Sequence, residues 1–432
     1  MKKNMLFGLV VVFLAVITMP YVSHAVPSFA RQVQKPCTAC HTMWPNLNQA
    51  GRQFKVKAYT DASEKWDMIN KDGLNLATTF PVSARVLYFP EVREDNDTTG
   101  FHQSSTQFDQ VALFIASRVY DYAGVFASAE WSPDSNTFGL PTAKVAFQYP
   151  LGKGNTIGVV GFKGLASAAD PFNAVGGRDR SLAWGDESEP LILTRGWTFS
   201  FSDEGNVGTV VHGYFLGNRL YAAVGAMRGG KSEDVSGGAL LNAEPGVAVA
   251  DTDPYDRFWR LAWDQKLPNG AVTIGVVGYD GTQRILDGTT FLPSFDTKVK
   301  RSYVDLSLEQ NFGEDHLFEL QALVGNGEEK NIFGGDEQRK FSGSYIEGSY
   351  FYDRTIGFVV ALNTIKFKDV DAADVTGHED TIDSTLVSLN YLPWLNTKLA
   401  LQYVTTKTKF VDPDVEPDQT NKISRIVFDV AF

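Results

Sequence analysis

Cysteine is scarce in this sequence, since Cys37 and Cys40 are the only two among 432 residues. One pair of cysteines cannot complete a zinc site that needs a second pair, and it leaves no network of structural disulfides. Long apolar runs are also scarce, because none after residue 25 is long enough for a membrane-spanning helix. Basic residues are not in excess. The formal net charge of −12 argues against a role in binding the phosphates of nucleic acid.

Residues 1–25 have the pattern of an export signal. Lys2 and Lys3 form a basic start, an apolar run covers residues 5–19, and small residues around Ala25 suit a cleavage site. We therefore expect this segment to be removed. The mature chain is predicted to hold a short segment at 26–73 and a long one at 74–432, fused into one unit.

The motif Cys37-Thr38-Ala39-Cys40-His41 lies in the short segment. A Cys-x-x-Cys-His run is the attachment site of a c-type haem, because two thiols at this spacing form thioethers to one porphyrin. The following histidine then supplies an axial ligand to the iron. The motif predicts one covalent haem c on Cys37 and Cys40, with His41 as the proximal ligand. Fewer than fifty residues cannot easily bury a porphyrin alone, so the rest of the chain is expected to cover it.

Residues 74–432 contain many segments of about ten residues in which apolar and other side chains alternate. The pattern is clear in 259–264, 356–363 and 426–432. Alternation of this kind is typical of an outer-membrane barrel, which presents apolar residues to lipid and polar ones to its lumen. Aromatic residues crowd the segment ends, as in the girdles of such barrels, and Phe432 resembles their C-terminal assembly signal. A soluble β-sandwich or β-solenoid is the alternative.

The alternation predicts an all-β fold, an antiparallel barrel of about 16 strands with a partly helical haem segment before it. Short turns and long loops alternate between the strands, so the haem segment is expected to enter from the periplasmic side. Residues 189–202 are assigned to a long loop that folds into the pore. The predicted strands lie near 74–90, 107–120, 122–132, 142–150, 155–164, 206–216, 218–228, 255–267, 270–280, 299–312, 315–326, 340–352, 354–367, 381–391, 396–408 and 421–432.

The chain resembles the fused cytochrome–porin family, the monohaem outer-membrane cytochromes of iron-oxidising bacteria. The resemblance is carried by Phe29–Gln32, Cys37–His41 and Gly51–Lys55, followed by a porin-like barrel. It implies a haem held by or within the barrel, electrons taken from extracellular Fe(II), and their transfer to a periplasmic soluble cytochrome or other electron carrier. One-electron transfer at the haem needs no further catalytic residue.

The second axial ligand of the haem iron is left open by the sequence. Met68 precedes the first predicted strand and is one candidate, because a Met/His pair raises the reduction potential; an ordinary packing role is the alternative. His102 and His212 are others if they face the lumen. Haem packing is predicted for three aromatic residues, which could equally fill the lumen: Trp44, Phe54 and Trp66.

Two rival functions also fit the sequence. One is a channel for small anions with an accessory haem segment, suggested by Arg178, Arg180 and Arg195 in the long loop at 165–205. The other is electron export to an extracellular acceptor. Acidic outer loops at 369–380 and 412–418 would concentrate cations at the mouth of the barrel, although solvated loops need no such role.

Overall fold

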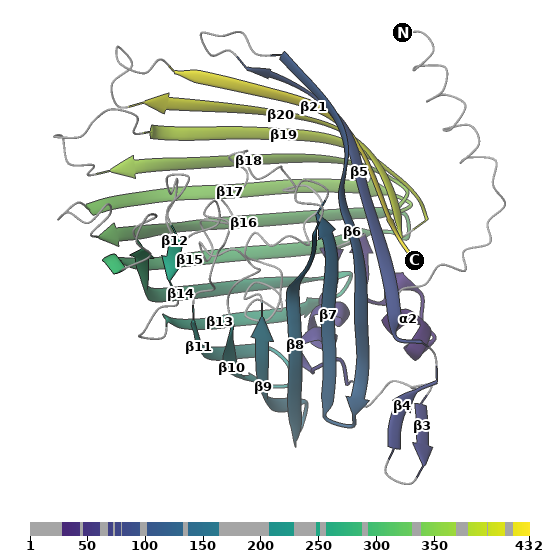
Figure 1. Cartoon of the computed structure of the whole chain (residues 1–432). Coiled ribbons are helices and arrows are strands. Elements are labelled where there is room, and N and C mark those ends of the chain that lie inside the picture. The colour runs from purple at the N-terminus through teal and green to yellow at the C-terminus, as the bar shows by residue number, and fades with distance from the viewer. Residues whose placement is uncertain are drawn as a thin grey trace.

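In the computed structural model, sixteen long antiparallel strands within the described residues form a closed barrel, as the alternation predicted (Figure 1). A three-residue strand, β12, pairs beside them with β14. The structure describes residues 28–43, 46–60, 68–71, 74–78, 80–95, 102–132, 137–163, 207–228, 248–250, 256–286, 293–330, 338–368, 379–394, 396–410 and 418–432.

The barrel strands follow chain order around the ring, and β21 pairs with β5 to close it. Their bounds are β5 (Val82–Asp95), β6 (His102–Tyr120), β7 (Ala123–Ser132), β8 (Thr137–Gly152), β9 (Asn155–Lys163), β10 (Val207–Phe215), β11 (Leu220–Arg228), β12 (Ala248–Ala250), β13 (Asp256–Leu267), β14 (Gly270–Leu286), β15 (Pro293–Phe312), β16 (His316–Lys330), β17 (Gln338–Tyr352), β18 (Ile356–Lys368), β19 (Glu379–Trp394), β20 (Thr397–Phe410) and β21 (Gln419–Ala431).

Side chains alternate between the two faces of the barrel wall. In β13, Trp259, Leu261 and Trp263 are exposed on the outer face, while Arg260 and Asp264 are buried on the inner one. The same alternation of burial recurs in β21. Apolar residues outside and charged residues inside are what lipid on one face and a polar lumen on the other require.

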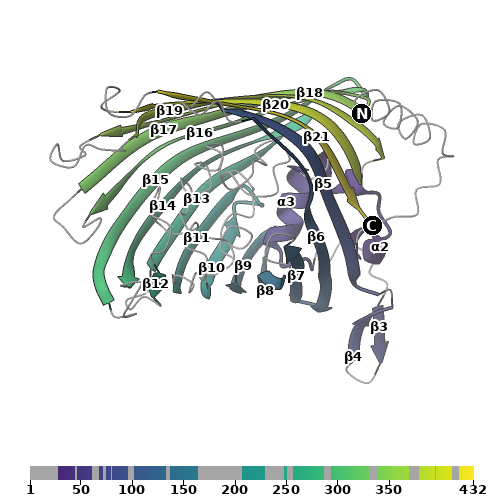
Figure 2. The same ribbon diagram turned by 45° about the horizontal axis from the view of Figure 1, so that its top comes forward.

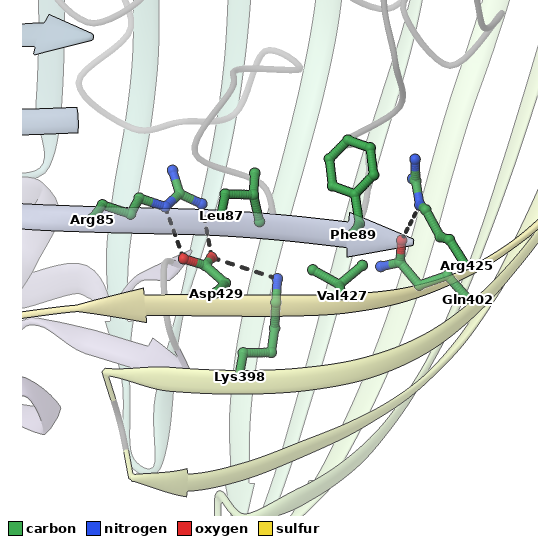
Figure 3. A pocket seen from close by; sticks show the side chains of 8 residues that line it. All are labelled: Arg85, Leu87, Phe89, Lys398, Gln402, Arg425, Val427 and Asp429. Atoms are coloured by element: carbon green, nitrogen blue, oxygen red, sulfur yellow. Dashed lines mark hydrogen bonds and ion pairs between the residues drawn. The ribbon is translucent and has the colours of Figure 1, made fainter. Parts of the chain in front are cut away.

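The seam between the first and last strands is held by charge as well as by the backbone ladder. Arg85 of β5 donates from Nε and Nη2 to the Asp429 carboxylate of β21, at 2.8 and 2.7 Å. Lys398 of β20 brings its Nζ to 4.0 Å from the same carboxylate (Figure 3). Phe432 exchanges two backbone hydrogen bonds with Ala84. Buried pairing of this kind fixes the register in which the barrel closes.

The first predicted strand, 74–90, differs from what the structure shows. Residues Leu74–Ala77 form β4, which pairs with β3 (Met68–Lys71) in a separate hairpin, and the barrel strand begins only at Val82. Pro81 intervenes, and proline has no N–H to give to a strand ladder. The hairpin projects from the short-turn end of the barrel (Figures 1 and 2).

Several strands are longer than the sequence pattern predicted. The segments 91–106 and 281–298 were expected to be loops, yet most of both belongs to paired strands. Alternation of apolar residues stops where lipid stops, whereas backbone pairing continues into water with polar side chains. The predicted pore loop at 189–202 lies outside the described residues.

The N-terminal segment contains short elements before the barrel. They are α2 (Ser28–Val33), the 3₁₀ turn η1 (Cys37–Ala39), β1 (His41–Met43), β2 (Asn46–Leu47) and α3 (Gln49–Val56). The partly helical character expected of this segment is confirmed by α2 and α3. Figure 2 shows α3 inside the barrel, behind β5 and β6. No helix in the described part of the chain is both long and apolar enough to span a membrane.

Candidate functional site

The Cys37–His41 motif forms a compact turn before α3. The Cys40 N–H donates to the Cys37 carbonyl at 3.0 Å, which closes the 3₁₀ turn η1. Both cysteines are half-buried thiols and do not form a disulfide with each other. Partial burial raises the pKa of the Cys37 thiol above its ordinary value, so it stays protonated at neutral pH. His41 begins β1, which pairs with β2 and turns the chain back toward α3.

Asn48 joins this turn to the start of α3. Its side-chain oxygen accepts the Gly51 N–H at 2.9 Å, the standard role of asparagine at a helix N-cap. Its backbone N–H donates to the Cys40 carbonyl at 2.9 Å. Its Nδ2 lies within hydrogen-bonding distance of the Thr38 and Ala39 carbonyls, at 3.2 and 3.3 Å. Asn48 therefore attaches the motif to the start of the helix.

Arg52 anchors the N-terminal half of α3 to the barrel wall. Its Nη2 lies 3.4 Å from Glu309 Oε1 of β15 and 3.7 Å from Asp264 Oδ1 of β13. Glu309 Oε1 also accepts the Gln49 N–H at 3.0 Å. Arg52 is only 3% exposed, so the pairing takes place away from bulk water. Tyr214 and Thr273 donate to Asp264, which fixes the carboxylate on the wall.

The C-terminal end of α3 meets the other side of the barrel. A Cβ on Gly124 of β7 would stand 2.1 Å from the Ala58 carbonyl, so only glycine lets the chain approach the wall there. Gln148 of β8 donates to Thr60 Oγ1 at 3.1 Å. The Tyr59 ring packs tilted against Phe126 of β7, with centroids 6.4 Å apart.

These two sets of contacts show that the N-terminal segment crosses the lumen. Around the ring, six long strands separate β7 from β15 in one direction and eight in the other, so the two walls are nearly opposite. α2 lies against the β6 wall, where Gln32 donates to the Ala116 carbonyl at 2.8 Å. Residues 28–60 carry five basic side chains and no acidic one, which suits the carboxylates of the lumen wall.

The structure places the aromatic residues predicted to pack on a haem in different ways. Phe54 belongs to an aromatic cluster with Phe29 and Tyr59, with centroids 5.2 and 5.6 Å from its own. Phe29 and Tyr59 stack at 4.5 Å. Trp44 and Trp66 lie outside the described residues. The cluster gives the lumen segment an apolar core of its own.

The candidate distal ligands are dispersed. The Met68 backbone lies in β3, in the projecting hairpin rather than beside α3 (Figure 2). His212 of β10 is 4% exposed and faces the lumen, its ring tilted against Tyr221 and its Nδ1 without a hydrogen-bond partner in the described part of the chain. His316 contacts Tyr350 on the outer face. His378 and the side chain of His102 are outside the described residues.

Sequence reasoning missed the residues that hold the segment in the barrel. Glu309 and Asp264 lie at inward-facing positions of strands whose side chains alternate between the two faces of the wall. That pattern marks them as lumen residues but does not indicate their partner. Asn48 directly precedes α3, and the only sequence feature that points to it is the general preference of asparagine for the N-cap position. Within the described ranges, no group of three or more His, Cys, Asp and Glu side chains is placed to hold a metal ion.

The fold is shared with solved porins. An anion-selective porin from Comamonas acidovorans aligns with a TM-score of 0.53 and 13% identity, covering 81% of this chain and 99% of that one. OmpF of Salmonella typhi, in a complex with daunomycin, aligns with a TM-score of 0.50 and 12% identity over 84% of this chain and all of that one. Such identities show the fold alone. With its apolar exterior, this porin-like barrel is placed in the outer membrane, in contact with lipid.

No protein-family model matches the chain. No curated protein matches it either.

Proposed function

We propose that this chain is a monohaem outer-membrane cytochrome fused to a porin-like barrel, as its resemblance to the fused cytochrome–porin family implies. It takes electrons from extracellular Fe(II) and passes them to a periplasmic electron carrier. The observation that carries the proposal is that the segment bearing Cys37–His41 lies within the barrel, anchored at two nearly opposite walls. A redox centre on this segment would be enclosed by the protein that crosses the membrane.

The residues present fit a covalently attached haem c. Cys37 and Cys40 are available as thiols, and His41 follows directly as the nitrogen donor. Such a haem, when bound, supplies reversible one-electron chemistry. The chain's own part is to hold the motif still: η1 closes the turn, Asn48 joins it to α3, and Arg52 joins α3 to the wall. Electron transfer requires this fixed position and no proton-transferring side chain.

Enclosure within the barrel offers a physical reason for the fusion. The hydrocarbon layer is roughly 30 Å thick, and a carrier confined to the periplasm cannot reach Fe(II) outside it. A centre held in the lumen shortens that separation from both sides. Ferric products, which precipitate, would then form outside the cell. The acidic segments 369–380 and 412–418, expected from the sequence to be outer loops, would attract Fe²⁺ in preference to anionic reductants.

His212 and Met68 remain the candidates for the distal ligand. It faces the lumen from β10, two residues from Tyr214, which donates to Asp264, the carboxylate that also pairs with Arg52. The inward-facing side of β10 is thus on the part of the wall where α3 is anchored. The Met68 backbone lies in the projecting hairpin rather than at this part of the wall.

The test uses intact cells of a host that attaches c-type haem but has no other outer-membrane cytochrome. Added Fe(II) should reduce the haem, which is read from the visible spectrum, and His41→Ala should abolish the response. Replacing Cys37 and Cys40 by Ala should remove haem-stained protein from denaturing gels. Wild-type haem that stays oxidised with Fe(II), yet is reduced by small membrane-permeant reductants, would contradict iron oxidation and favour electron export.

The porin-like fold supports a second candidate, a channel for small anions. Conductance in planar bilayers separates the two. A channel function predicts steady, anion-selective conductance from purified protein, and the segment across the lumen predicts a conductance well below that of an open barrel with the same number of strands.

A further inference from the structure

Asn48 makes more contacts with the Cys37–His41 turn than its capping role requires. A helix N-cap needs only an acceptor, which Asn48 Oδ1 provides to Gly51. Its Nδ2 donates in the other direction, toward the Thr38 and Ala39 carbonyls, and its backbone N–H reaches the Cys40 carbonyl. Three consecutive carbonyls of the motif therefore face a single residue.

Gly51 provides an independent observation that the turn is seated on the helix. A Cβ at Gly51 would stand 2.1 Å from the Cys40 oxygen and 3.0 Å from the Cys40 carbonyl carbon. These are backbone atoms, so no side chain can move aside to make room. The first turn of α3 and the backbone at Cys40 are thus in close contact, and the contact exists only because Gly51 has no side chain.

We propose that Asn48 is a positioning residue for the haem-attachment motif. Its carboxamide links the turn to α3, and so it sets the direction in which the motif presents its thiols and imidazole within the lumen. The identity of the attached group rests on the proposed function. The positioning itself rests on the contacts of Asn48 and Gly51.

The two roles of Asn48 can be separated by substitution. Asn48→Asp keeps an oxygen acceptor for the Gly51 N–H and places a favourable negative charge at a helix N-terminus, so the cap survives. It has no N–H to offer the Thr38 and Ala39 carbonyls, and its charge repels them. Ala50→Asp is the matched control, because it adds the same charge at an exposed position of the same helix turn.

The experiment compares wild type, Asn48→Asp and Ala50→Asp, made with and without haem attachment. With haem, we measure covalent haem per barrel and the midpoint reduction potential. Without haem, we measure the alkylation rate of Cys37 and Cys40 in the folded barrel. For Asn48→Asp we expect at least a two-fold loss of attached haem, a shifted potential, and several-fold faster alkylation. Ala50→Asp should match wild type in all three.

Gly51→Ala should behave like Asn48→Asp, because its Cβ displaces the same turn. The proposal is overturned if Asn48→Asp equals wild type in haem yield, potential and alkylation, or if Ala50→Asp produces the same changes. Wild type without covalent haem would instead refute the proposed function. The alkylation rates would still decide whether Asn48 holds the turn.

Discussion

Replacing Arg52 by methionine tests whether the two buried ion pairs of this residue hold the N-terminal segment across the lumen. At an effective dielectric constant of about 20, charges at 3.4 and 3.7 Å attract by about 5 and about 4.5 kcal/mol before desolvation is counted. Breaking a buried pair from one side usually costs about 3–5 kcal/mol. Here the remaining carboxylates keep other donors, Gln49 N–H for Glu309 and Tyr214 for Asp264. We therefore expect the lower end, about 3 kcal/mol.

That loss should appear as undocking of α3 rather than unfolding of the barrel. A change of about 3 kcal/mol raises the equilibrium constant for opening about 150-fold. Hydrogen exchange of the α3 amides, followed by mass spectrometry in detergent micelles, should accelerate by that factor, while amides of β16–β19 keep their wild-type rates. Lys55→Met removes the same charge from a half-exposed position of α3 and should change the exchange of α3 less than about three-fold.

The outcome that refutes this reasoning is specific. If α3 in Arg52→Met exchanges within three-fold of wild type, the ion pairs of Arg52 do not hold the segment. If Lys55→Met has an equal effect, overall positive charge rather than the pairing with Glu309 is responsible. In a double-mutant cycle with Glu309→Gln, the two effects should be clearly non-additive.

Three other predictions concern the wall, the iron ligand and the outer loops. Gly124→Ala should displace the segment that follows α3 and lower the free energy that protects its amides from hydrogen exchange by about 1–3 kcal/mol. Gly161→Ala, whose Cβ would meet nothing within 4 Å, should leave that exchange unchanged. Equal exchange rates in the two variants would contradict the close approach of the segment to Gly124. If His212 is the distal ligand, His212→Ala should change the haem spectrum and potential while Met68→Ala leaves both unchanged; if Met68 is the ligand, Met68→Ala should lower the potential. If the proposed Fe(II) oxidation is right, reduction of the haem by Fe(II) in intact cells should slow as salt rises, because salt would screen the acidic segments 369–380 and 412–418; a rate independent of ionic strength would exclude their role.

The barrel was predictable because lipid imposes a simple rule on sequence. Trp259, Leu261 and Trp263 alternate with inward residues since each must face hydrocarbon, and that period of two is visible without any knowledge of the fold. The number of long strands followed from it. The ends of the strands did not, because beyond the lipid the pairing of β14 with β15 continues through polar residues that carry no such signal.

The lumen contacts could not be predicted for a different reason. Arg52 and Glu309 are 257 residues apart, and nothing in either neighbourhood specifies the other. Their meeting depends on closure of the barrel and on the depth to which α3 enters it. The motif itself was recognisable from five consecutive residues. The supporting role of Asn48 was not, because its side chain binds backbone carbonyls, which have no sequence signature.

A segment that crosses the bore, within a barrel sealed by its first and last strands, imposes an order on biogenesis. Residues 28–60 precede β5 in the chain, yet the seam forms only when β21 arrives and Phe432 bonds to Ala84. By then the wall already surrounds the segment. Any bulky group that is attached to Cys37 and Cys40 is therefore best attached in the periplasm, before the barrel closes. If the proposed haem is attached there, its attachment and the insertion of the barrel into the membrane become consecutive steps, and a chain that misses the first closes around a motif without haem.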